Sequence, residues 1–161
     1  MTKVPGSTVT PKVADIGYAQ LDLSRGARCG AGEVVYGEGK TAEQVAGIVD
    51  APIAAGQRHV LVTRLSAEKF ERARELMESD TPLEYHADAR IAIAGGMPVQ
   101  NGNGTIVVAC AGTSDLPVAE EAALTAEFLG NRVERVCDVG VAGLHRLLAH
   151  ADQLARAQVI V

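Results

Sequence analysis

Short runs of β-branched residues alternate with amphipathic segments from Glu33 onward. The runs EVVY (33–36) and HVLVT (59–63) predict two strands, because Val and Thr favour extended backbone. A third strand is expected within Leu83 to Ala94, most clearly over RIAIA (90–94). Since two helices fit between these runs, the first half of the chain predicts a small βαβαβ unit.

Both of these helices have recognisable start signals. Thr41 precedes Gln44 by three residues, which predicts a capping box, and Pro52 and Gly56 are expected to stop that helix. Ser66 is expected to cap the second helix. Its apolar positions recur at helical spacing, as Phe70, Ala73, Leu76 and Met77.

A glycine-rich segment separates the two halves of the chain. Residues 96–104 are predicted to be a linker, because Gly, Pro and Asn interrupt both helices and strands. A phosphate-gripping loop is the alternative, although neither GxGxxG nor GxxxxGK[ST] spacing occurs there. The predicted division is a loose arm over 1–20, an α/β unit over 21–95, this linker, and a second α/β region over 105–161.

The alternation restarts after the linker. TIVVA (105–109) predicts a strand, followed by a helix to about Leu129 and a strand over 133–139. One further helix is expected to carry an apolar face, and the last four residues look like the start of a strand; the face comprises Val141, Leu144, Leu147, Leu148 and Leu154. Alternating strands and helices predict a parallel sheet, with ligands at the carboxyl ends of its strands.

Composition and charge exclude two classes of partner. The net charge is −5 without a basic run and aromatic residues make up only 3%, so no nucleic-acid partner is expected. No stretch approaches the ~20 apolar residues of a membrane helix, and no signal peptide is recognisable. We therefore expect a soluble, cytoplasmic protein.

Cysteine and histidine give no sign of a disulfide framework or a metal site. Cys29, Cys110 and Cys137 are odd in number and lack CxxC spacing, which favours buried, inert thiols in a reducing compartment. The four histidines share no ligand spacing with cysteines or carboxylates.

The first candidate site is Gly112-Thr113-Ser114-Asp115, between a strand and a helix. Gly112 allows a ligand close to the backbone, and Thr113 and Ser114 offer hydroxyls beside the free amides of a helix start, which favours a phosphate. Asp115 is a candidate for binding a ribose hydroxyl or positioning a proton donor. Ordinary helix capping, with Pro117 in the first turn, explains the same residues.

The second candidate site follows the next strand, at Gly140-Val141-Ala142-Gly143-Leu144-His145-Arg146. His145 near a helix start suits a neutral general base, and Arg146 is a permanent cation able to hold phosphate or carboxylate. A solvated His-Arg pair on a helix face is the alternative. Two such turns on neighbouring strands are more informative than either alone.

The stretch CAGTSDLPVAEEAALTAEFLGNRVERVCDVGVAGLHRLL, from Cys110 to Leu148, closely resembles the LarB family of pyridinium-3,5-biscarboxylic acid mononucleotide synthases. That family is related to the PurE family of aminoimidazole ribonucleotide carboxylases, which has a similar phosphate loop and an Ala-His-Arg. The resemblance extends upstream to residues that follow the family's amino-terminal pattern, with Gly32 where that pattern usually has proline: Asp22, Arg25, Arg28, Gly30, Glu33, Val34, Val35, Lys40 and Thr41.

The resemblance implies the start of a flavodoxin-like carboxylase domain acting on nicotinic acid adenine dinucleotide. CO2 or bicarbonate carboxylates the pyridinium ring, the phosphoanhydride is hydrolysed, and the product enters nickel-pincer nucleotide biosynthesis. Asp115 and His145 would be catalytic, and the other site residues would bind substrate: Gly112, Thr113, Ser114, Gly140, Gly143 and Arg146. A homo-oligomer is implied, without a tightly bound cofactor.

The resemblance also implies a longer protein than this sequence. The family's nucleophilic cysteine lies beyond the region that matches, and none of the three cysteines here takes its place. We therefore expect an amino-terminal piece that is inactive alone. Two other functions stay open, a PurE-like carboxylase or mutase and a non-catalytic nucleotide-binding module.

Overall fold

The computed structural model describes residues 12–161, apart from the side chain of Cys29. The described part begins with an antiparallel hairpin of β1 (Val13–Asp15) and β2 (Gln20–Asp22), followed by the short helix α1 (Arg25–Cys29). Residues 13–15 therefore lie in a hairpin and not in the loose arm that we predicted over 1–20. Residues 1–11 of that arm lie outside the described residues.

The first large sheet is mixed. It contains β3 (Glu33–Tyr36), β4 (Val60–Thr63), β5 (Leu83–His86) and β6 (Ile91–Ala94) in the order β3-β4-β6-β5. Strands β3, β4 and β5 run in one direction, and β6 runs opposite to its neighbours β4 and β5. The predicted βαβαβ order is confirmed over β3 to β5, but the sheet is not parallel throughout as expected, because a tight turn ending at Arg90, in the left-handed region at φ 53°, reverses the chain into β6.

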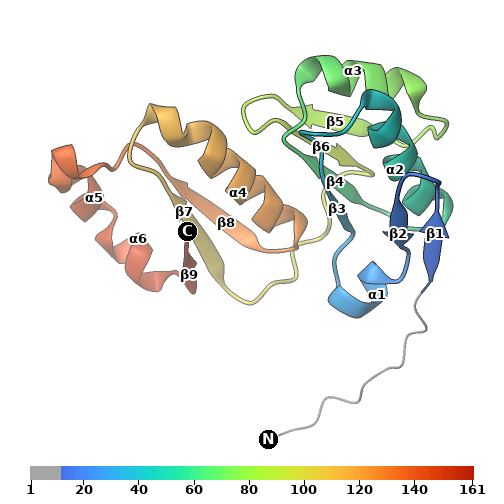
Figure 1. Ribbon diagram of the computed structural model, residues 1–161. Helices are drawn as coiled ribbons and strands as arrows, with labels where there is room; N and C mark the ends of the chain where they lie inside the picture. Colours follow the sequence, from blue (N-terminus) through green and yellow to red (C-terminus); the bar gives the residue numbers. More distant parts are fainter. Residues whose placement is uncertain (1–11) are drawn as a thin grey trace, which may run out of the picture.

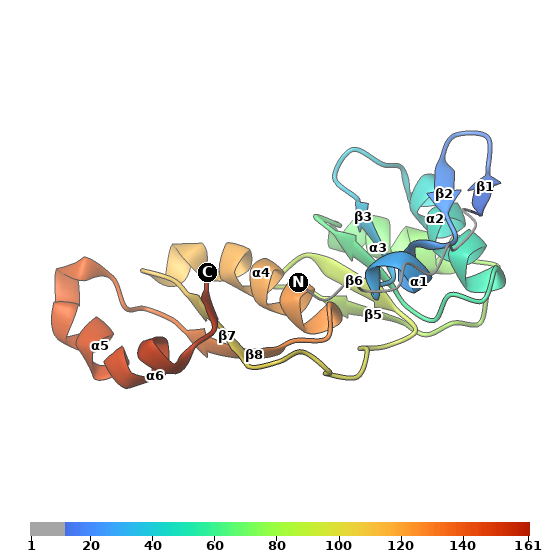
Figure 2. The ribbon, with the colours of Figure 1, turned by 90° about the horizontal axis from the view of Figure 1, so that it is seen from below.

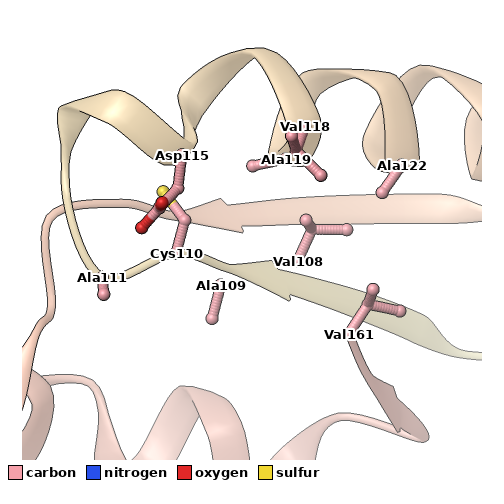
Figure 3. A pocket seen from close by; sticks show the side chains of 9 residues that line it. All are labelled: Val108, Ala109, Cys110, Ala111, Asp115, Val118, Ala119, Ala122 and Val161. Carbon is pink, nitrogen blue, oxygen red and sulfur yellow. The ribbon is translucent and has the colours of Figure 1, made fainter.

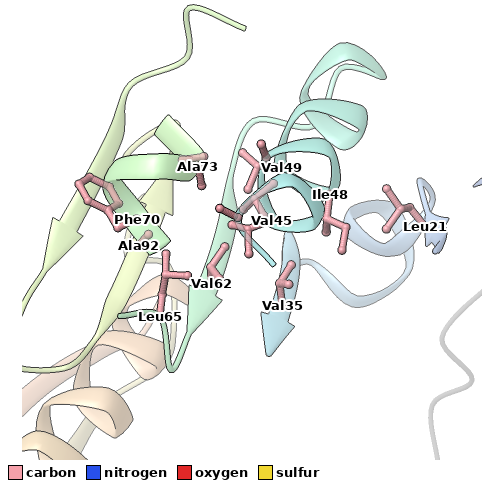
Figure 4. Close-up of a cluster of buried hydrophobic side chains, with 14 residues drawn as sticks. Leu21, Val35, Val45, Ile48, Val49, Val62, Leu65, Phe70, Ala73 and Ala92 are labelled. Carbon is pink, nitrogen blue, oxygen red and sulfur yellow. The ribbon is translucent and has the colours of Figure 1, made fainter. Parts of the chain in front are cut away.

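Helices α2 (Ala42–Ala54) and α3 (Ala67–Leu76) cover one face of this sheet (Figures 1 and 4). The predicted capping box of Thr41 with Gln44 is confirmed, as is the cap at Ser66. Pro52, expected to stop α2, lies inside it. Because it falls in the last turn, the helix ends only two residues later.

The second sheet is parallel, as predicted. It has the order β8-β7-β9, formed by β7 (Thr105–Ala109), β8 (Arg132–Val136) and β9 (Val159–Ile160). Helix α4 (Leu116–Phe128) covers one face, and α5 (Leu144–Ala149) and α6 (Ala151–Arg156) cover the other (Figure 2). The chain is a mixed α/β protein whose second half is part of a flavodoxin-like domain.

The single helix expected after Gly140 is broken into three pieces. A 3-10 turn, η2 (Val141–Gly143), precedes α5, and the chain bends at His150 before α6. Leu147 and Leu154 pack against the sheet, whereas the other residues of the predicted apolar face are exposed: Val141, Leu144 and Leu148. The prediction of one continuous face is wrong because the bend turns the two helices differently.

Helix α4 is shared between the two sheets. Ala119 and Ala123 pack on β7 and β8, while Leu124 and Phe128 pack against the first sheet, on the face opposite α2 and α3. The loop over 95–104 contains no helix or strand and reaches α4's end through amides of Asn101 and Gly102. Whether this loop is a domain boundary stays a prediction. No helix within residues 12–161 is long and apolar enough to span a bilayer.

Candidate functional site

The loop after β7 folds back on itself through the two ends of the predicted phosphate motif. A carboxylate oxygen of Asp115 accepts from the Gly112 amide at 3.0 Å, and the Asp115 amide donates to the Gly112 carbonyl at 3.1 Å. These bonds shape the short 3-10 turn η1 (Thr113–Asp115), which leads directly into α4. The Asp115 side chain thus closes this turn, whereas it makes no capping hydrogen bond to α4, the role that we considered as the alternative.

The bonds between Gly112 and Asp115 leave hydrogen-bond donors available in the middle of the loop. Neither the Thr113 amide nor the Ser114 amide donates to any group in the described part of the chain. Both side chains are exposed, and both hydroxyls lie at the start of a 13-residue helix, whose dipole favours negative charge. The loop therefore offers amides and hydroxyls to an anion from solvent.

The loop after β8 touches the first loop through its backbone. The Gly140 amide donates to the Ala111 carbonyl at 2.9 Å, and the Val139 amide donates to the Cys110 carbonyl at 3.2 Å. A Cβ at Gly140 would lie 2.8 Å from the Ala111 oxygen, so only glycine allows this approach. The two predicted turns therefore meet at one edge of the sheet.

Arg146 lies back along the second loop. Its guanidinium pairs with Asp138 at 2.5 Å, and a Cβ at Gly143 would lie 2.7 Å from the Arg146 Nε. The arginine thus remains near the loop, with part of its charge balanced by Asp138. His145 is exposed, and its ring makes no hydrogen bond within residues 12–161.

A pocket of about 340 Å³ adjoins the first loop (Figure 3). Its walls are apolar, formed by β7, α4 and the end of the chain, and Asp115 is the one charged side chain that lines it. The residues along the walls include Val108, Val118, Ala122 and Val161.

Two of the cysteines are neighbours in the fold, which we did not predict from the sequence. Cys110 follows β7 and Cys137 follows β8, and each is the first residue after its strand. Partial burial, and next the neighbouring Cys110 thiol, raise the pKa of Cys137. Cys110 is buried as expected, but Cys137 is exposed, so the prediction of buried thiols is wrong there. The matching positions of the two residues after neighbouring strands were the available signal.

A second polar cluster lies at the ends of β3 and β4. The Tyr36 hydroxyl donates to Glu38, the Lys69 ammonium donates to the Glu38 carbonyl at 2.6 Å, and Arg64 pairs with Glu121 of α4. The pair of Arg64 with Glu121 ties the end of β4 to helix α4. Within the described residues, no group of three or more His, Cys, Asp or Glu is arranged to hold a metal ion.

Comparison with known proteins places this geometry in context. Residues 13–95 match the sequence profile of the LarB/PurE-like N-terminal domain. The chain is also 33% identical over 147 residues to the uncharacterized protein MJ0165 of Methanocaldococcus jannaschii, an alignment covering 87% of this chain. It spans 56% of the length of that relative.

Proposed function

The chain belongs to the LarB/PurE-related family, a family of carboxylase and mutase type, and from that premise we propose that its two joined loops bind the phosphate of a nucleotide undergoing carboxylation. The nucleotide that we propose is nicotinic acid adenine dinucleotide. CO2 or bicarbonate is the co-substrate, and hydrolysis of the phosphoanhydride releases AMP. The product is pyridinium-3,5-biscarboxylic acid mononucleotide, for nickel-pincer nucleotide biosynthesis.

The observation that carries the proposal is the backbone contact between the loops. The Gly140 amide bonds the Ala111 carbonyl, and this contact supports the proposal that Thr113 and Ser114 of one loop and Arg146 of the other serve one ligand. A phosphate there would accept from two amides and two hydroxyls and lie near a guanidinium.

The adjoining pocket supports a pyridinium ring as the reacting group. A cationic ring beside Asp115 is stabilised by electrostatic attraction to the carboxylate, whereas a neutral aminoimidazole is not. Carboxylation replaces a ring hydrogen with a carboxylate, so one proton must leave. His145, exposed near the second loop, is our candidate to accept it.

Binding of nicotinic acid adenine dinucleotide, measured by isothermal titration calorimetry, tests the site. Ser114→Ala removes a hydroxyl donor to a charged oxygen and is expected to weaken binding by about tenfold or more. Ser66→Ala, which removes a cap from the distant helix α3, is the matched control and should leave affinity unchanged. Equal affinity of both variants and the parent chain would reduce the loop to plain helix capping.

Incorporation of carbon-14 from bicarbonate tests the reaction separately. Label in the pyridine nucleotide supports the proposal, whereas label only in aminoimidazole ribonucleotide would indicate the purine-type reaction. Tight nucleotide binding without label in either nucleotide is the result expected of a piece that is inactive alone, as it is of a nucleotide-binding module. Assembly as a homo-oligomer is part of the proposal and is measured by light scattering.

A further inference from the structure

Cys110 and Cys137 occupy neighbouring positions at the end of the parallel sheet. The last strand pair is Ala109 with Val136, and the Cys110 amide continues the ladder by donating to the Val136 carbonyl at 3.0 Å. The two cysteines are therefore the next pair in register. Cα atoms of neighbouring strands lie about 4.8 Å apart, inside the range of about 4.4 to 6.8 Å that a disulfide spans.

Both thiols lie on the face covered by α4. Cys110 packs with Ala119 and Ala123 of that helix. Arg135, two residues before Cys137, binds Glu120 and Glu127 of the same helix, and alternate residues of a strand share a face. The raised pKa of Cys137, to which the neighbouring Cys110 thiol contributes, agrees with this placement.

The backbone beyond Cys137 has room to adjust. Asp138 has a left-handed φ of 58°, and Val139, not Asp138, donates to the Cys110 carbonyl, so regular pairing ends there. Cys137 and Asp138 are both exposed. Because the ladder of backbone hydrogen bonds ends there, it does not oppose the small shift that brings the two sulfurs to bonding distance.

We propose that Cys110 and Cys137 form a reversible disulfide that controls ligand binding by the two joined loops. Cys110 lies two residues before Gly112, and Cys137 adjoins Asp138, the partner of Arg146. The bond would pull both loops toward each other and move the donors of the phosphate site. The control of binding rests on the proposed function, whereas the formation of the bond does not.

The oxidant in this reaction is a low-molecular-weight disulfide such as glutathione disulfide. The exposed Cys137 thiolate attacks one sulfur of the oxidant, forming a mixed disulfide and releasing one thiolate. Cys110 then attacks the Cys137 sulfur and releases the second thiolate. Two protein thiols lose two electrons and two protons, and the oxidant is reduced to two thiols.

The rate should depend on pH. Because burial and the Cys110 thiol raise the pKa of Cys137, its reactive thiolate is scarce at pH 7, and oxidation should accelerate through pH 9. Glu120 of α4 adds to the rise and Arg135 of β8 opposes it. Glu120→Gln is therefore expected to speed the reaction at a given pH.

Peptide mapping after treatment with glutathione disulfide at pH 8 tests the bond. Trypsin separates the three cysteines into peptides that contain Cys29, Cys110 and Cys137 respectively, because arginine or lysine lies between them. The expected result is a covalent pair of the Cys110 and Cys137 peptides that dithiothreitol separates. The pair should persist in Cys29→Ser and disappear in Cys137→Ser.

Two results would overturn the proposal. One is that Cys137 carries only bound glutathione, or pairs with Cys29, under conditions that exhaust its free thiol. The other is that the disulfide forms but the chain binds nicotinic acid adenine dinucleotide equally before and after oxidation. If the reduced chain binds no nucleotide while the disulfide still forms, the proposed function fails and the redox pair stands. Mapping of the parent chain needs no variant to fold.

Discussion

At the residue scale, Gly140 determines how closely the two loops approach. Its amide donates to the Ala111 carbonyl, and a Cβ at this position would come too close to the same oxygen. The backbone at Gly140 has a φ of −61°, which any residue adopts, so the need for glycine is purely steric. The contact therefore offers a clean test of loop packing.

Gly140→Ala is expected to lower the free energy of unfolding by about 1 to 3 kcal/mol, because the added methyl group must push the loops apart. Urea denaturation measures the loss. Gly39→Ala is the control, since a Cβ at Gly39 meets nothing within 4 Å. A change no larger than the control's would contradict the close approach.

Tyr36 offers a second residue-scale prediction. Its phenol donates to the Glu38 carboxylate, and this bond, with smaller contributions from burial and charge, raises the pKa of Tyr36 above 10.0. Ultraviolet absorbance should show that Glu38→Gln lowers this pKa, with Tyr36→Phe identifying the transition. Because the folded pKa is raised, the stabilisation is present below pH 10 and is lost as pH rises through the folded value. An unchanged pKa in Glu38→Gln would contradict the bond.

The sequence predicted the structural role of some residues and not of others. Thr41 and Ser66 were recognised as caps because capping depends on neighbours three residues away. The left-handed conformation of Arg90 was not expected, since arginine rarely adopts it, whereas aspartate adopts it more readily and Asp138 carried a weak local signal. Only the turns that tertiary packing imposes at the sheet edges explain them.

At the scale of elements, α4 joins the two sheets. Leu124 and Phe128 fill the space beneath β4 and β6, and Ala119 and Ala123 pack on the second sheet. Arg64 reinforces the contact through Glu121. Because one helix contributes to both cores, the two sheets are expected to unfold together.

Phe128→Ala should therefore destabilise the whole chain, by about 3 to 5 kcal/mol. Tyrosine fluorescence reports on the first half, which contains all three tyrosines, and circular dichroism reports on both halves. The two transitions should shift together. Leu129→Ala, at an exposed neighbour, is the control and should cost far less. Separate transitions would show that the sheets fold independently.

The periodicity of apolar residues predicted the positions of helices and strands better than the direction in which the strands run. The strands and helices over 105–139 were expected nearly where they occur, since long apolar runs and a Pro117 start specify them. The hairpin in 83–94 and the bend at His150 were missed, because both depend on which surface each segment meets. Alternating apolar residues do not say whether the neighbouring strand runs parallel.

At the scale of the whole molecule, the family assignment and the fold agree. The resemblance to LarB proteins was drawn from motifs on both sides of the linker, and the match of residues 13–95 confirms the family. The parallel β8-β7-β9 order explains why the two motifs meet, since both follow neighbouring strands. Roles of individual site residues stay predictions.

The convergence of both loops on one phosphorylated ligand is the central claim, and amide nuclear magnetic resonance during titration with nicotinic acid adenine dinucleotide tests it most directly. The amides of Thr113 and Ser114 and those of residues 139–146 should shift together, with one common dissociation constant. Shifts confined to one loop, or two loops titrating with different constants, would contradict the account.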